Sequence, residues 1–239
     1  MDKIDFLKTE ISRIGIELSD KQIEQFLTYY ELLVEWNSFM NLTGITEFED
    51  VVIKHFIDSL SLVKSIDLNE ELSLIDVGTG AGFPGLPLKI AFPNLKVTLL
   101  DSLQKRIHFL DEVIYRLDLN GIDTVHGRAE DFAKPDKLRE KYDLCVSRAV
   151  ANLSVLSEYC LPFVKENGYF ISYKSEKLSE ELKAADKAIT VLGGCFEKQI
   201  DFTIGNDNMY RNLVLIKKIA DTPKQYPRKS GIASKKPIC

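Results

Sequence analysis

The chain has few features of a secreted or membrane protein. Its 239 residues include only four cysteines, at positions 145, 160, 195 and 239, and none of them belongs to a C-x-x-C pair. This spacing argues against a disulfide framework and a zinc site, so we expect reduced, buried thiols and no bound metal. The chain also lacks an apolar run of about 20 residues, the length that spans a bilayer, and it lacks a signal peptide at its start. We therefore expect a cytoplasmic protein with no membrane partner.

Charge is distributed unevenly along the chain. The formal net charge is −5, yet residues 217–239 hold seven basic residues and one acidic residue. An acidic body with a basic end is typical of proteins that hold a polyanion at one place, although a solvated basic tail gives the same pattern. Three prolines and a glycine predict that the basic C-terminal tail, residues 220–239, is loop-like rather than helical.

The most informative stretch is 74–85, which reads Leu-Ile-Asp-Val-Gly-Thr-Gly-Ala-Gly-Phe-Pro-Gly. An apolar run leads into Asp76, four glycines follow, and a second apolar run occupies residues 86–91. This pattern predicts a strand, a tight turn and a helix. Glycines let the backbone approach a ligand closely, and the start of a helix presents free N–H groups. The stretch therefore predicts a nucleotide-cofactor loop.

Two cofactors compete for this loop. The glycines at 80, 82 and 85 fit G-x-G-x-x-G, and Asp101 lies about 20 residues further on, as in dinucleotide-binding dehydrogenases. The wider pattern, Asp76-x-Gly78-x-Gly80-x-Gly, resembles the first motif of methyltransferases that use S-adenosylmethionine. The extra carboxylate favours S-adenosylmethionine, because it would repel a pyrophosphate but can help to bind an amino group and a sulfonium. Asp101 is placed to accept hydrogen bonds from the ribose hydroxyls of either cofactor.

The remaining pattern predicts an α/β fold in three parts. Residues 1–67 form a helical N-terminal subdomain, 68–219 a cofactor domain, and 220–239 the tail. In the N-terminal part, a helix begins at Ser19-Asp20 and a further helical stretch runs from about 47 to 63. The strands expected in the cofactor domain are 73–77, 96–100, 122–126, 142–147 and 168–174, followed by 195–204 and 210–219. The helices expected between them are 84–92, 103–118, 129–133, 153–160 and 176–192.

Alternating strands and helices imply a parallel sheet, and the last two strands form a hairpin signal around Gly205-Asn-Asp-Asn208. We therefore expect a Rossmann-like class I S-adenosylmethionine-dependent methyltransferase fold. Its sheet would have seven strands, mostly parallel, with a terminal antiparallel hairpin and an N-terminal helical extension.

The end of the fourth strand, Ser147-Arg148-Ala149, is where a methyltransferase presents its acceptor. A buried arginine there needs an anionic or hydrogen-bonding partner, which is either the substrate or a structural carboxylate. The position has no Asn/Asp-Pro-Pro-aromatic sequence, and Cys145 lies inside the strand with no proline before it, unlike a cytosine-C5 nucleophile. The acceptors that remain include guanine N7, which has a free lone pair and needs no general base.

Motifs outside the cofactor loop make the resemblance specific. From about residue 30 to its end, the chain resembles the RsmG family, also called GidB, which methylates guanine N7 in bacterial small-subunit ribosomal RNA. The motifs that carry the resemblance are Trp36-Asn37, Asn41-Leu-Thr43, His55-x-x-Asp58-Ser-Leu60, Asp76 to Gly85, Asp101-Ser102, Lys105-Arg106, Arg128-Ala-Glu130, Ser147-Arg-Ala149 and Tyr226-Pro-Arg-Lys229. One departure is Lys174-Ser175, where the family pattern is Lys-Gly.

The loop and the resemblance together imply two sets of site residues. Those expected to bind the cofactor are Asp76, Gly78, Gly80, Phe83, Asp101, Ser102, Ala129, Glu130 and Arg148. Those expected to contact RNA are His55, Asp58, Lys174, Arg211, Arg228 and Lys229. No residue is assigned as catalytic, because guanine N7 requires no general base. A purely structural role for His55 remains open.

The resulting hypothesis is an S-adenosylmethionine-dependent methyltransferase that modifies N7 of a guanine in bacterial 16S ribosomal RNA. Its partner would be 16S ribosomal RNA or the small ribosomal subunit, and nothing in the sequence requires more than a monomer. Two alternatives stay open: a methyltransferase-like fold that binds RNA as an assembly factor without turnover, and a dehydrogenase that uses NAD. A small-molecule methyltransferase is disfavoured, since the basic tail would then have no purpose.

Overall fold

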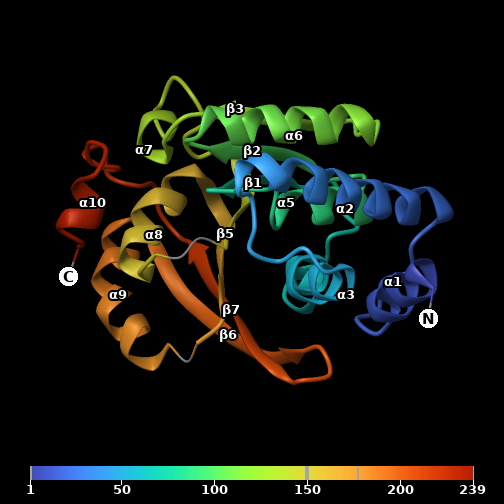
Figure 1. Cartoon of the computed structure of the whole chain (residues 1–239). Helices are drawn as coiled ribbons and strands as arrows, with labels where there is room; N and C mark the ends of the chain where they lie inside the picture. The colour runs from blue at the N-terminus through green and yellow to red at the C-terminus, as the bar shows by residue number, and fades with distance from the viewer. Residues whose placement is uncertain (1, 149–150, 177, 239) are drawn as a thin grey trace.

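The computed structural model describes residues 2–148, 151–176 and 178–238, and its centre is a seven-stranded sheet (Figure 1). The strand order is β3-β2-β1-β4-β5-β7-β6. The strands are β1 Ser73–Val77, β2 Lys96–Asp101, β3 Ile122–His126, β4 Tyr142–Ser147, β5 Val164–Lys174, β6 Gly194–Ile204 and β7 Met209–Lys218. Strands β1 to β5 pair in parallel, whereas β7 runs antiparallel to both β5 and β6. The predicted mostly parallel sheet with a terminal hairpin is confirmed.

Helices cover both faces of this sheet (Figure 1). The α-helices are α1 Lys3–Ser12, α2 Asp20–Met40, α3 Phe48–Val51, α4 Asp58–Leu60, α5 Gly85–Ala91, α6 Gln104–Arg116, α7 Ala129–Phe132, α8 Leu153–Cys160, α9 Ser179–Val191 and α10 Ile232–Lys235. A π-helical segment, η1, spans Val52–Ile57, and two 3-10 segments, η2 and η3, span Ser61–Lys64 and Leu161–Phe163.

Successive side chains of the central strands enter opposite cores. In β1, Leu74 belongs to the core that packs under α2, α5 and α6, whereas Ile75 belongs to the core under α8 and α9. This alternation follows from the period of two in an extended strand. Because helices cover both faces, four of the five residues of the central strand β1 are buried. β1 lies between β2 and β4, so the chain turns in opposite directions on its two sides, and ligands bind at such a point in open α/β sheets.

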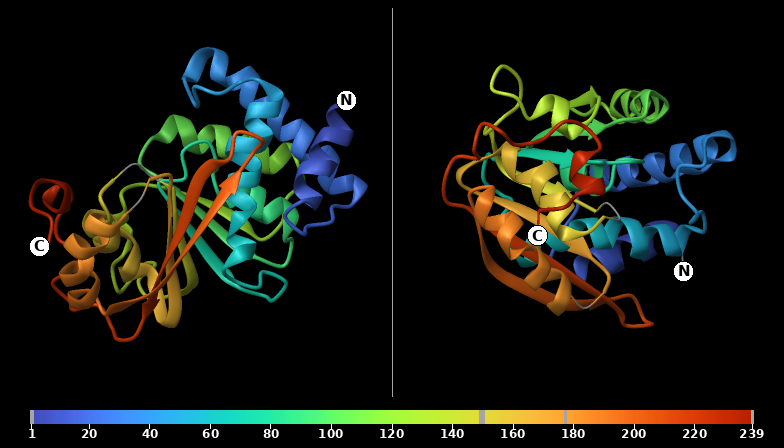
Figure 2. Two further views of the ribbon diagram at one scale, coloured as in Figure 1. Left: turned by 90° about the horizontal axis from the view of Figure 1, so that it is seen from below. Right: turned by 90° about the vertical axis from the view of Figure 1, so that its left-hand side faces the viewer.

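The N-terminal helices pack against the sheet domain. Ser19 begins α2 through a capping box, in which its hydroxyl accepts from the Gln22 amide and the Gln22 side chain accepts from the Ser19 amide. This start was predicted. Phe26 and Tyr29 of α2 lie in the same core as Leu86 of α5. Figure 2 shows the helical run from α3 to α4 beside the tip of the β6–β7 hairpin.

Three elements differ from the prediction in helix type or by more than two residues at one end. The helical stretch expected over 47–63 contains η1, whose wider turn the sequence did not indicate. β5 begins at Val164 rather than at 168, because Val164 already pairs with Tyr142 before an irregularity at Asn167, where φ is +68°. α9 begins at Ser179 rather than at 176. Part of that predicted helix, residue 177, lies outside the described residues.

The tail and the cysteines also depart in part from expectation. The tail is loop-like except for the single turn α10, which fits between Gly231 and Pro237. Cys145 and Cys160 are buried as predicted, but Cys195 is exposed because it lies on the outermost strand, β6. Cys239 lies outside the described residues. Within the part of the chain that the structure describes, no helix has the length and apolar character needed to cross a bilayer.

Candidate active site at the carboxyl ends of the strands

The glycine-rich loop joins β1 to α5 and is held by contacts with β2 and α2. The amides of Gly78 and Thr79 donate to the Leu100 carbonyl of β2 at 2.9 and 3.2 Å. Gly82 has φ of +100°, and a Cβ there would lie 2.3 Å from Leu86 Cδ1 and 2.9 Å from the Tyr29 hydroxyl. Glycine is therefore required at position 82 for both conformation and space.

Asp76 is buried beneath this loop and organises it. Its Oδ2 accepts hydrogen bonds from the Thr79 hydroxyl at 2.6 Å and from the Gly85 amide at 2.8 Å. Its Oδ1 is buried and has no hydrogen-bond partner among the described residues. Burial raises the pKa of the Asp76 carboxyl to about 6, against the opposing effect of these two hydrogen bonds. A nearby cationic ligand would favour the ionised form of this carboxylate.

Asp101 ends β2 and ties that strand to the loop. Its Oδ2 accepts from the Gly80 amide at 2.9 Å and from Arg106 Nη1 at 3.2 Å, and its Oδ1 accepts from the Leu103 amide at 2.9 Å. The carboxylate that was expected to meet a ribose is thus oriented by the loop itself. Asp101 also lines a pocket at this end of the sheet.

That pocket, the cofactor pocket, has a volume of about 230 Å³ and lies where β1, β2 and β4 end. Its lining residues are Val77, Gly78, Leu100, Asp101, Ser102, Gly127, Arg128, Ala129, Glu130, Ser147, Ala151, Leu156 and Tyr159. Five predicted cofactor residues are among them: Gly78, Asp101, Ser102, Ala129 and Glu130. Of the other four, Asp76 lies in β1, Gly80 and Phe83 belong to the glycine-rich loop, and Arg148 lines a second, larger cavity.

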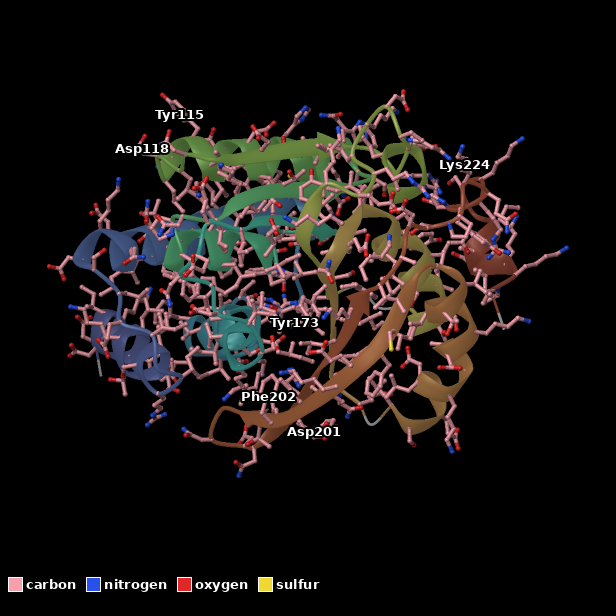
Figure 3. The ribbon with its side chains drawn as sticks, turned by 180° about the vertical axis from the view of Figure 1, so that it is seen from behind. Tyr115, Asp118, Tyr173, Asp201, Phe202 and Lys224 are labelled. Atoms are coloured by element: carbon pink, nitrogen blue, oxygen red, sulfur yellow. The ribbon has the colours of Figure 1, made fainter. Side chains whose placement is uncertain are left out.

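A larger groove of about 950 Å³, the acceptor groove, opens beside the cofactor pocket. Its lining residues are Lys54, His55, Asp58, Arg148, Ala151, Asn152, Tyr173, Lys174, Ser175, Glu176, Leu178, Glu180, Glu181, Ala184 and Arg211. Ala151 lines both cavities, so they are adjacent. Four of the six predicted RNA contacts line this groove: His55, Asp58, Lys174 and Arg211. Figure 3 shows Tyr173 between the helical run and the β6–β7 hairpin.

Asp58 joins two arginines at the base of the acceptor groove. Its Oδ2 lies 3.0 Å from Arg148 Nη1, and its Oδ1 lies 3.1 Å from Arg211 Nε. The Asp58 residue is only 5% exposed, so both ion pairs are largely shielded from water. Arg148 therefore has the structural carboxylate partner that the sequence left open, and one carboxylate fixes two cationic side chains.

His55 links Arg148 to the glycine loop. Its ring stacks on Phe83, with centroids 4.4 Å apart and planes at 21°, and the Arg148 guanidinium lies 4.9 Å from the same phenyl ring. Arg148 Nη2 lies 3.2 Å from His55 Nδ1. Because a guanidinium can only donate, Nδ1 accepts and Nε2 carries the proton, which it donates to the Thr43 hydroxyl oxygen at 2.8 Å.

This environment keeps His55 neutral. Burial, together with the positive charge of Arg148, lowers the pKa of His55 to about 3. An imidazole with that pKa is a weak base, which stays neutral and keeps its single N–H proton at neutral pH. The site can therefore bind and orient an acceptor, but His55 is not suited to remove a proton from it.

Comparison with known proteins identifies the relatives of this site. A family model described as rRNA small subunit methyltransferase G matches residues 22–213. The chain belongs to the GidB family. The Ribosomal RNA small subunit methyltransferase G of Lachnoclostridium phytofermentans is 55% identical over 225 residues, which cover 94% of this chain and 93% of that protein. The protein of the same name from Alkaliphilus oremlandii is 54% identical over 238 residues, the full length of both chains.

Solved structures resemble this GidB chain in fold alone. M. jannaschii TYW2 in complex with AdoMet superposes with a TM-score of 0.52 at 17% identity, over 63% of this chain and 71% of that one. A SAM dependent methyltransferase from Aquifex aeolicus superposes with a TM-score of 0.51 at 19% identity, over 68% of this chain and 90% of that one. The predicted class I methyltransferase fold is confirmed. Membership of the GidB methyltransferase family confirms the predicted cofactor, S-adenosylmethionine.

Two predicted RNA contacts of the GidB chain lie away from the acceptor groove. The Arg228 guanidinium binds the buried Glu158 carboxylate, with Nη2 to Oε2 at 2.5 Å, whereas the side chain of Lys229 is exposed. Within the groove, Lys174 donates to the Ala151 carbonyl and to Glu181 Oε1, both at 2.7 Å. Its charge is therefore neutralised in the free protein.

Three residues of the GidB site were not predicted from the sequence. The Tyr29 hydroxyl donates to the Ala81 carbonyl at 2.5 Å and so holds the glycine loop from above. Thr43 Oγ1 accepts a hydrogen bond from His55 Nε2, and the Tyr173 hydroxyl donates to the Ser59 carbonyl at 2.8 Å. Tyr29 lies within the apolar stripe of α2 and looks like an ordinary core residue. The Asn-Leu-Thr motif was the one available signal for Thr43.

Proposed function

We propose that the chain transfers the methyl group of S-adenosylmethionine to N7 of a guanine in 16S ribosomal RNA of the small ribosomal subunit. One observation carries the proposal: the cofactor pocket and the arginine-lined acceptor groove adjoin at Ala151, and the groove is lined by a neutral histidine that stacks on Phe83 of the glycine loop. The names of the near-full-length relatives support ribosomal RNA as the acceptor.

The residues present fit S-adenosylmethionine. The buried Asp76 Oδ1, which lacks a hydrogen-bond partner among the described residues, suits a cationic ligand near the loop. Gly78, Asp101, Ser102, Ala129 and Glu130 would hold the adenosine part, and Gly80 would keep Asp101 in place. When bound, the cofactor supplies an electrophilic methyl group on a sulfonium.

The protein contributes orientation rather than proton transfer. Guanine N7 bears no proton, so no residue has to act as a base. Asp58 holds Arg148 and Arg211 in fixed positions at the groove, and the neutral His55 keeps Arg148 against Phe83. A methylated guanine carries a positive charge, and the groove is also lined by the exposed carboxylates of Glu176 and Glu180, which can offset it.

The same groove would receive the RNA. His55, Asp58, Lys174 and Arg211 line it, and phosphate groups are natural partners for its lysine and arginine side chains. Lys229 would add a contact from the exposed face of the tail. With ribosomal RNA as the proposed substrate, the proposed location is the cytoplasm. We also propose that the chain acts as a monomer.

The decisive experiment maps the methylated base. The purified protein is incubated with methyl-labelled cofactor and either naked 16S ribosomal RNA or small subunits from cells that lack the protein. We expect label at N7 of a single guanine, located by strand cleavage at 7-methylguanosine. Absence of transfer to every ribosomal substrate would favour an RNA-binding assembly factor instead.

Two controls separate the remaining alternatives. Calorimetry with S-adenosylmethionine and with NAD should show binding of the former alone, and tight NAD binding without a response to S-adenosylmethionine would overturn the proposal. Gly78→Arg should abolish methyl transfer while RNA affinity stays within about twofold, because Gly78 lines the cofactor pocket and adopts a φ of +75°.

A further inference from the structure

The C-terminal segment, defined here as residues 222–238, lies against α8 (Figure 1). Ala233 is buried, and Ile238 belongs to the core beneath α8 and α9. Arg139 donates hydrogen bonds to the carbonyls of Tyr226 and Thr222. The basic charge of this segment predicted a contact with RNA, but the contacts that fix its path are made within the chain.

The strongest of these contacts joins Arg228 to Glu158 of α8. The Arg228 Nε lies 2.9 Å from Glu158 Oε1, its Nη2 lies 2.5 Å from Oε2, and its backbone amide donates to Oε1 at 2.8 Å. Glu158 is 1% exposed. Removing one partner of a buried, bidentate ion pair leaves the charge of the other uncompensated. Arg228 is therefore needed to neutralise the buried Glu158 carboxylate.

Downstream of Arg228, the segment contacts three residues that line the cofactor pocket. The Gly231 amide donates to Glu130 Oε1 at 3.1 Å. Arg128 Nη1 donates to the Ser230 hydroxyl at 2.9 Å, and the hydroxyls of Tyr159 and Ser234 lie 2.8 Å apart. Arg128, Glu130 and Tyr159 line the cofactor pocket, whereas no described residue of the segment does. The segment therefore influences the pocket indirectly, through its hydrogen bonds to these three side chains.

We infer that the C-terminal segment positions the wall of the cofactor pocket, and that Arg228 and Glu158 are the positioning residues that hold it there. Glu130 is 5% exposed, and the Gly231 amide fixes its carboxylate through Oε1 without using Oε2. A carboxylate oriented in this way can accept a hydrogen bond from an adenine amino group at little entropic cost. The inference rests on the proposed function, since that function assigns the pocket to S-adenosylmethionine.

The role assigned to Arg228 differs from that of its neighbour Lys229. The Arg228 side chain is occupied by Glu158, whereas the Lys229 side chain is exposed. Figure 3 shows Lys224 of the same segment projecting outward. One face of the segment thus holds the pocket wall, while its lysines remain available to phosphate groups.

The test compares Arg228→Ala and Gly231→Ala with the matched control Lys229→Ala. Gly231 has φ of +80°, and a Cβ there would meet nothing within 4 Å, so alanine strains the backbone at the Glu130 contact without a clash. Affinity for S-adenosylmethionine is measured by calorimetry without RNA, and kcat and the two KM values are measured with small subunits. Thermal unfolding verifies that each variant is folded.

We expect Arg228→Ala and Gly231→Ala to weaken cofactor binding and raise the KM for S-adenosylmethionine by roughly tenfold, with kcat and the KM for RNA within about twofold of wild type. Arg228→Lys, which keeps the charge but loses the bidentate geometry, should recover part of the affinity. Lys229→Ala should leave cofactor affinity unchanged.

The opposite pattern would overturn the inference: unchanged cofactor affinity and a raised KM for RNA in Arg228→Ala. If that variant does not fold, Gly231→Ala decides alone. A wild-type protein that fails to bind S-adenosylmethionine would contradict the proposed function itself, and this outcome differs from a loss confined to the variants.

Discussion

At the scale of single residues, the acceptor groove depends on Asp58. One carboxylate, almost fully buried, accepts Arg148 on one oxygen and Arg211 on the other, 3.0 and 3.1 Å away. Arg148 directly follows β4 and Arg211 lies in β7, two strands that do not pair with each other, and Asp58 begins α4. The groove is thus assembled by one charged contact between three elements.

We expect Asp58→Asn to lower the free energy of unfolding by about 3 kcal/mol, because it leaves two guanidinium groups without a compensating charge. The KM for RNA should rise by tenfold or more, since both arginines lose their fixed orientation. Cofactor affinity should change little, because Asp58 does not line the cofactor pocket. Denaturant unfolding, calorimetry and steady-state kinetics measure the three quantities.

Asp50→Asn serves as the control, since Asp50 forms a more exposed ion pair with Lys54 at 2.8 Å on the same helical run. We expect a loss of at most about 0.5 kcal/mol for that variant. Equal destabilisation by the two substitutions would show that the groove does not depend on the double ion pair.

A second residue-scale prediction concerns Asp76 and pH. Its pKa in the folded protein is about 6, above the ordinary value of 3.8, so the folded protein holds this proton more tightly than the unfolded chain. The stability that it contributes is therefore present below pH 4 and is lost as the pH rises through 6. A cationic ligand favours the ionised carboxylate, so cofactor affinity should increase as the pH rises through 6.

Calorimetry at constant ionic strength should accordingly show S-adenosylmethionine binding about tenfold more tightly at pH 7.5 than at pH 5, because only about a tenth of the carboxylate is ionised at pH 5. Asp76→Asn should flatten this profile and weaken binding at pH 7.5. His126→Gln is the control, since that exposed ring lies 3.2 Å from the Ser102 carbonyl. If His126→Gln flattens the pH profile of cofactor affinity and Asp76→Asn does not, the assignment of this pH dependence to Asp76 is wrong.

At the scale of elements, the turn between β1 and α5 distinguishes two glycines. Both have positive φ, but a Cβ on Gly80 would meet nothing within 4 Å, whereas one on Gly82 would collide with Leu86. Gly80→Ala should cost about 1 kcal/mol of stability from backbone strain alone. Gly82→Ala should cost at least about 3 kcal/mol, since α5 or Tyr29 must also move. Urea unfolding of the pair measures the difference, and equal losses would contradict the packing argument.

How far the sequence predicts these elements depends on the range of the interactions. The strands and the terminal hairpin were predictable because apolar runs and turn residues are local signals, and Asp76 with its glycines formed a local motif. The contacts that complete the site were not predictable in the same way. Arg228 meets Glu158 across 70 positions, and Arg211 meets Asp58 across 153. The π-helical turn that carries His55 also has no local signature, since it is set by packing.

At the scale of the whole molecule, the N-terminal helices and the sheet share one core. Leu7 and Ile11 of α1, Phe26 of α2, Leu74 of β1 and Leu215 of β7 all belong to a single buried cluster. The candidate active site depends on the same packing, because Tyr29 of α2 holds the glycine loop and His55 stacks on Phe83. Residues 1–67 were predicted as a subdomain, and the shared core gives a way to test whether they are separable.

We expect the fragment 68–239 to be unable to fold alone, because removing residues 1–67 would expose to water the apolar surface of α5 and α6 against which α2 packs. It should lack a cooperative thermal transition and should bind no S-adenosylmethionine, as read by near-ultraviolet circular dichroism and calorimetry. A chain that lacks only residues 1–18 should fold with reduced stability and still bind the cofactor, since α2 and its contact with Ala81 remain. If fragment 68–239 bound the cofactor with wild-type affinity, the N-terminal helices would be an independent unit that serves the acceptor groove alone.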